Sequence, residues 1–113
     1  MSDIETYSTI SDIREQVEVS LSQYFDDMSS GEFEGIGMYP ENSKTMVAVF
    51  LAASANHSIE DIKTDFADSL SKKDIESSYI EASNFIGKDQ HLVMNVVGIA
   101  RKLDIPVENL VIT

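Results

Sequence analysis

Apolar residues recur at spacings of three and four positions in four stretches of the chain, and this period constrains the fold more than any other feature. Such spacing places side chains on one face of an α-helix, because the helix has about 3.6 residues per turn. We therefore predict helices over residues 10–28, 59–70, 72–86 and 90–103. The first helix has its apolar stripe at Ile10, Ile13, Val17, Leu21, Tyr24 and Met28.

Helix start and stop signals support these segments. Thr9 with Asp12, and Ser58 with Asp61, have the three-residue spacing of a capping box, in which the first side chain accepts a hydrogen bond from a free backbone N–H. Gly87 is a natural C-terminal stop for the third helix, because glycine readily adopts the backbone conformation that ends a helix.

The middle of the chain can be interpreted in two ways. Residues 40–43 have turn chemistry and are followed by a run with β-branched and aromatic members, which favours a β-hairpin of residues 33–39 and 45–52. The alternative is a buried helix from Ser43, because the run also contains several alanines. We predict the hairpin, and residues 110–113 are compatible with a further short strand.

These elements predict an α+β fold with about four helices and a small antiparallel sheet, and the alternative is an all-α bundle. A chain of 113 residues suits one domain, so we predict a single acidic domain over residues 1–113. The N-terminus is acidic where a signal peptide would be basic, and residues 46–53, the longest strictly apolar run, are too few to cross a bilayer. We therefore expect a cytoplasmic protein without membrane contact.

Negative charge is concentrated near the N-terminus. Residues 1–43 hold ten acidic side chains and one basic one, a net charge of −9, and residues 44–113 hold ten acidic and seven basic side chains, a net charge of −3. Together these give the net charge of −12 for the chain. Such a field repels nucleic acid and favours a basic protein partner, so we expect no direct nucleic-acid binding.

The predicted partner-binding residues lie on the first helix and in the loop that follows it. Asp26, Asp27, Glu32 and Glu34 supply carboxylates, and Phe33 is an apolar anchor between two of them. Glu15 and Glu18 fall off the apolar stripe of the first helix and extend the acidic surface.

This pattern suggests a non-catalytic binding protein that inhibits or neutralises a basic nuclease, toxin or DNA-binding enzyme. By composition the chain is similar to immunity proteins and DNA mimics, which are small, acidic and poor in cysteine, as this cysteine-free chain is. The alternative on the non-enzymatic side is an export chaperone or adaptor, which would bind through an apolar groove.

A third hypothesis comes from the tripeptide Asp68-Ser69-Leu70. It resembles the attachment sequence of acyl and peptidyl carrier proteins, which implies a phosphopantetheine arm on Ser69. A carrier serine lies at a helix N-terminus, whereas the apolar stripe of the predicted helix over residues 59–70 places Ser69 near a helix end.

Metal binding and catalysis find little support in the sequence. Residues 26–37 resemble a calcium loop, but Met28 and Gly37 stand where oxygen ligands are needed. His57 and His91 each lie beside a helix start, where capping or solvation accounts for them. The absence of cysteine removes thiolate chemistry and sulfur ligands. We predict no metal site, no cofactor and no enzymatic activity.

Overall fold

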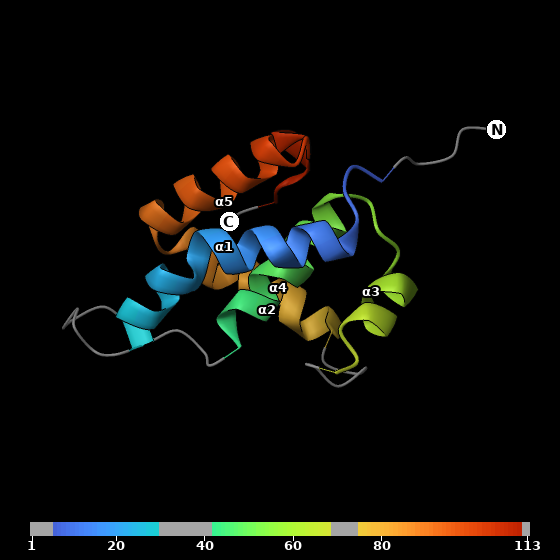
Figure 1. Cartoon of the computed structure of the whole chain (residues 1–113), viewed down its shortest axis with the longest axis horizontal. Helices are drawn as coiled ribbons and strands as arrows, with labels where there is room; N and C mark the ends of the chain where they lie inside the picture. The colour runs from blue at the N-terminus through green and yellow to red at the C-terminus, as the bar shows by residue number, and fades with distance from the viewer. Residues whose placement is uncertain (1–5, 30–41, 69–74, 112–113) are drawn as a thin grey trace.

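The computed structural model describes residues 6–29, 42–68 and 75–111, with the side chains of residues 27–29 and 76 excepted. These residues form helices packed around a common core (Figure 1). The helices are α1 (Ile10–Ser29), α2 (Ser43–Ser54), α3 (Ile59–Asp65), α4 (Ile75–Gly87) and α5 (Gln90–Lys102), followed by a 3-10 turn at Val107–Asn109. The described residues contain no strand, so this part of the chain is all-helical, as the alternative from the sequence proposed.

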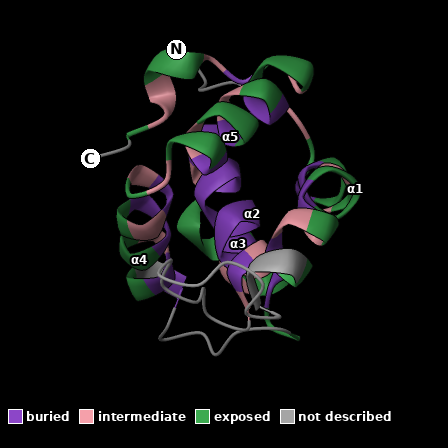
Figure 2. Cartoon of the chain, turned by 90° about the vertical axis from the view of Figure 1, so that its left-hand side faces the viewer, coloured by how far each residue is buried: buried purple, intermediate pink, exposed green. Residues whose placement is uncertain are grey.

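Helix α2 lies at the centre of the bundle, between α1 and α4 (Figure 2). Its residues Val47, Phe50 and Leu51 are fully buried, and the Phe50 ring stacks on Tyr79 of α4 with ring centroids 5.4 Å apart. A helix that is covered on nearly every side must be apolar nearly all round, which explains why the sequence of α2 shows no amphipathic period.

The predicted β-hairpin of residues 33–39 and 45–52 is wrong, because residues 43–54 form α2. The β-branched residues that favoured a strand, Val47 and Val49, are tolerated in a helix because packing on several sides stabilises it. The alanines at positions 48, 52 and 53 were the correct signal, because alanine has the highest intrinsic helix propensity. The first arm, residues 33–39, lies outside the described residues.

The short C-terminal strand is also not formed at residues 110 and 111, and residues 112–113 lie outside the described part of the chain. This segment is held by side chains instead of by strand pairing. The Ser83 hydroxyl of α4 donates to the carbonyl oxygen of Val111 at 2.8 Å, and the Asn109 side-chain amide donates to the carbonyl oxygen of Ser54 at 3.0 Å. Among the described residues there is no strand with which this segment could pair.

Helix α1 confirms the first predicted helix and its start signal. The backbone N–H of Asp12 donates to the Thr9 hydroxyl at 3.0 Å, as a capping interaction requires. The buried stripe runs through Ile10, Ile13, Val17 and Leu21 and then continues to Phe25. Tyr24, which the periodicity placed on the stripe, is only half-buried, and the side chain of Met28 is not described.

The other predicted helices exist with shifted ends. Ser58 caps α3 by accepting a hydrogen bond from Asp61, as predicted, but α3 ends at Asp65 and not at residue 70. Asp89 caps α5 by accepting from the backbone N–H groups of His91 and Leu92. None of the described helices is long and apolar enough to cross a membrane.

Candidate protein-binding surface

The solvent side of α1 carries several exposed carboxylates. Glu15, Glu18 and Asp26 are exposed and fall off the buried stripe, with Glu18 on the flank that meets α2, and we call these three residues the acidic face. Glu15 and Asp26 are eleven residues apart, so at about 1.5 Å per residue the charges extend along roughly 16 Å of helix. The exposure of Glu15, Glu18 and Asp26 is consistent with their predicted position off the apolar stripe, because the helix buries that stripe and leaves its other side to the solvent.

Arg14, the one basic residue among residues 1–43, contacts the end of α3 and the residues that follow it. Its guanidinium lies 4.7 Å from the centroid of the buried Phe66 ring. It also donates to the carbonyl oxygen of Asp65 at 2.8 Å and lies 3.7 Å from the Asp68 carboxylate. These contacts hold Arg14 beside the end of α3, and none of the three involves a residue of the acidic face.

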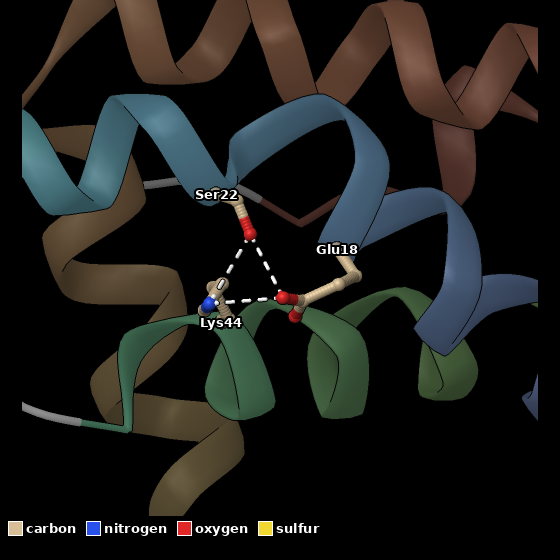
Figure 3. A network of polar contacts seen from close by, with 3 residues as sticks. All are labelled: Glu18, Ser22 and Lys44. Atoms are coloured by element: carbon tan, nitrogen blue, oxygen red, sulfur yellow. Dashed lines mark hydrogen bonds and ion pairs between the residues drawn. The ribbon is translucent and has the colours of Figure 1, made fainter.

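Glu18 belongs to a three-residue network that joins α1 to the start of α2 (Figure 3). Its Oε1 accepts a hydrogen bond from the Ser22 hydroxyl at 2.9 Å and lies 3.2 Å from Lys44 Nζ, which also donates to Ser22 Oγ at 3.2 Å. The Ser22 hydrogen bond and then Lys44 lower the pKa of Glu18. The carboxylate is therefore ionised and fixed in position, although 63% of the side chain remains exposed.

Val19 is an apolar side chain on the solvent side of α1 that the sequence interpretation missed. It is 74% exposed and lies between the charged residues in sequence. The sequence did indicate this exposure, since Val19 falls off the apolar stripe of the first helix, on the side that is otherwise polar. An exposed single valine is ordinary, so it gains meaning only together with neighbouring apolar groups.

The structure does not place the rest of the predicted contact residues. The side chain of Asp27, and all of Glu32, Phe33 and Glu34, lie outside the described part of the chain. The structure therefore brings Glu15, Glu18 and Asp26 onto one helix, and the contribution of the following loop stays a prediction. The calcium-like sequence of residues 26–37 extends into the same undescribed segment.

The carrier hypothesis rests on Ser69, which also lies outside the described residues. The described chain shows that α3 ends at Asp65 and that residues 66–68 form a turn. The predicted end of that helix at residue 70 is therefore wrong, and the position of Ser69 stays a prediction.

The two histidines have separate structural roles. The Nε2–H of His57 donates to the carbonyl oxygen of Ser8, which fixes the segment before α1. His91 is exposed in the first turn of α5, where its backbone N–H donates to Asp89. Among the described residues, no group of three or more His, Cys, Asp or Glu side chains is arranged to hold a metal ion.

Comparison of the chain with protein-family models, with curated proteins and with solved structures found no match. A function for this chain must therefore be argued from the position and chemistry of its own residues.

Proposed function

We propose that this protein is a non-catalytic binding module whose acidic face docks onto a basic surface of another protein. The observation that carries the proposal is the separation of charge on α1. Glu15, Glu18 and Asp26 face the solvent, whereas Arg14, the nearest cation in sequence, is engaged by Phe66 and the end of α3. Glu15 and Asp26 have no ion pair among the described residues, and Glu18, although paired with Lys44, keeps 63% of its side chain exposed, so this side of α1 carries an excess of negative charge.

The acidic face suits partners that normally bind nucleic acid. Its carboxylates extend over roughly 16 Å of helix, a length that corresponds to about five base-pair steps at 3.4 Å each. A carboxylate fixed by its neighbours, as Glu18 is by Ser22 and Lys44, loses less side-chain entropy when it meets a partner cation. The proposed partner is therefore a nuclease, toxin or DNA-binding enzyme, which the protein would inhibit in the manner of an immunity protein or DNA mimic.

The proposed binding surface is the outside of a helix and not a cleft. We therefore propose a role without catalysis or a bound cofactor. We propose a cytoplasmic location as part of the same hypothesis. Asp27, Glu32, Phe33 and Glu34 remain the proposed extension of the contact beyond α1.

The proposal can be tested by capturing partners from a lysate of the native host with the tagged protein. The captured complexes would be washed at about 0.1 M and then at about 1 M salt, because the Debye length falls from about 10 Å to about 3 Å. We expect mass spectrometry to identify a basic nuclease or DNA-binding protein that the high-salt wash releases.

A partner that survives the high-salt wash would contradict recognition by charge and would favour the adaptor hypothesis, since apolar contacts are not screened. The intact mass of the protein purified from its host tests the carrier hypothesis separately. A phosphopantetheine adduct on Ser69 would support that hypothesis and contradict a purely non-covalent role.

A further inference from the structure

An open groove of about 540 Å³ lies between α1 and α5. It is lined on α1 by Gln16 and Ser20. The lining residues on α5 are Met94, Asn95, Gly98, Ile99, Arg101 and Lys102. Met94 is 73% exposed, which is unusual for a long apolar side chain, and Val19, which lies on α1 beside the groove and outside its lining, is 74% exposed.

Gly98 has no evident role within the chain. A glycine in a helix interior costs about 1 kcal/mol relative to alanine, and such a residue usually makes room for a neighbouring group. Here an added Cβ at position 98 would meet no atom within 4 Å. The missing side chain therefore leaves the backbone of α5 open to a group from outside the described chain.

Helices α1 and α5 run antiparallel, as two cross-links show. The Ser8 hydroxyl, just before α1, donates to the carbonyl oxygen of Leu103, just after α5, at 2.7 Å. At the opposite end, the Tyr24 hydroxyl donates to the carboxylate of Asp89, which precedes α5. Counting along both helices from these two hydrogen bonds, at about 1.5 Å per residue, shows which residues lie at the same height along the helix axes. Asp12 lies within one residue of the height of Arg101, and Val19 lies within one residue of the height of Met94.

We propose that the α1–α5 groove is a self-association surface, occupied by the same surface of a second copy of this chain. If the two-fold axis runs parallel to the groove, α1 of one copy lies over α5 of the other, and every residue keeps its height along the helix axis. Asp12 of each copy would then face Arg101 and Lys102 of the other, and each Val19 would contact the opposite Met94.

Charge complementarity is the reason for choosing a second copy as the occupant. Arg101 and Lys102 are exposed and have no ion pair with a carboxylate among the residues that the structure describes. Asp12 is exposed and likewise has no basic partner in those parts of the chain. Each copy therefore carries both halves of the contact. Glu18 lies on the flank of α1 that meets α2 and would remain exposed on the dimer, whereas Glu15 and Asp26 lie one and two helical turns from Val19 on the same side of α1, at the edge of the contact.

Sedimentation equilibrium of the full chain at about 0.15 M salt, where the Debye length of about 8 Å weakens the repulsion between two acidic copies, tests the proposal. The surface is small, so we expect a dimer with a dissociation constant on the order of 10 μM. A monomer up to about 200 μM, well above that constant, would overturn the proposal.

Two charge reversals test the arrangement. One variant carries Asp12→Lys, and the other carries Arg101→Glu together with Lys102→Glu. Each variant alone should self-associate about tenfold or more weakly than wild type, because like charges then face each other twice. An equimolar mixture of the two proteins should dimerise again, because both contacts are then of opposite sign. Failure of the mixture to associate would overturn the two-fold arrangement, and a dimer unaffected by either reversal would place self-association elsewhere on the chain.

Circular dichroism of each protein separates a loss of association from a loss of folding, since all three positions are exposed. Val19→Ser combined with Met94→Ser provides a test that does not depend on charge. This variant should also weaken the dimer by about tenfold or more, because it removes apolar contacts made twice by symmetry. Unchanged self-association of the folded serine variant would overturn the groove as the interface.

Discussion

Helices α1 and α2 pack side by side, yet their residues serve different purposes. Nine of the 12 residues of α2 are buried, and its one charged residue, Lys44, lies in the first turn. In α1, a single apolar stripe is buried and the solvent side carries the acidic face. Substitutions in α2 should therefore affect folding, whereas substitutions on the outer side of α1 should affect binding.

The largest effect is expected from shortening a core side chain of α2. Phe50→Ala should lower the free energy of unfolding by about 3–5 kcal/mol, because Phe50 is fully buried and stacked on Tyr79. Ile80→Ala on α4 is the matched control, since Ile80 is 61% exposed and its truncation should change stability by less than about 0.5 kcal/mol. Urea denaturation measures both, and equal effects would contradict the placement of α2 at the centre.

A smaller effect is expected where α1 meets the end of α3. Arg14→Gln removes the contact with Phe66 and the hydrogen bond to the Asp65 carbonyl, and it should lower stability by about 1–2 kcal/mol. The same substitution removes a positive charge without touching the acidic face. Partner affinity should therefore stay the same or rise in a binding assay, and a loss of affinity in the folded variant would show that Arg14 belongs to the contact.

The smallest effect concerns the pH dependence of Glu18. Ser22 and Lys44 lower the pKa of Glu18 in the folded protein, so Glu18 contributes stability above the ordinary pKa of a glutamate, about 4.3. That contribution is lost as the pH falls through the lower folded-state pKa. Because the side chain is mostly exposed, the contribution should stay below about 1 kcal/mol.

Denaturation of wild type and Glu18→Gln from pH 7 downward measures this contribution. The difference in unfolding free energy between the two should shrink as the pH falls into the acidic range. A difference that grows on acidification would mean that the folded protein raises the pKa of Glu18, and the network with Ser22 and Lys44 would then be wrong.

Amphipathic helices were predicted from the sequence, whereas the buried helix was only the alternative to a predicted hairpin. The three- and four-residue period identified α1 because one side of it faces the solvent, and the same period placed Glu15, Glu18 and Asp26 outside. Residues 43–54 are covered on nearly all sides, so they show no period, and β-branched residues then favoured a strand. In such a run, alanine content is a better guide than the count of β-branched residues.

Contacts between distant residues also could not be predicted from local patterns. Lys44 meets Glu18 only because α2 packs against α1, and Arg14 meets Phe66 only because α3 turns back toward α1. The antiparallel arrangement of α1 and α5, on which the proposed self-association depends, likewise appears only in the fold.

The proposed function requires that the position of the carboxylates on α1, and not the overall negative charge, determines partner binding. The most direct test compares two triple variants with the same change of net charge in a titration against the captured partner. One variant neutralises the acidic face through Glu15→Gln, Glu18→Gln and Asp26→Asn. The control neutralises three exposed carboxylates elsewhere, through Glu60→Gln, Glu81→Gln and Glu108→Gln.

We predict that the acidic-face variant binds its partner about 100-fold more weakly than wild type and that the control changes affinity by less than about threefold. Equal losses in both variants would contradict the proposed function, because net charge alone would then explain binding. Full affinity in the acidic-face variant would contradict it as well, because the outer side of α1 would then not be the binding surface.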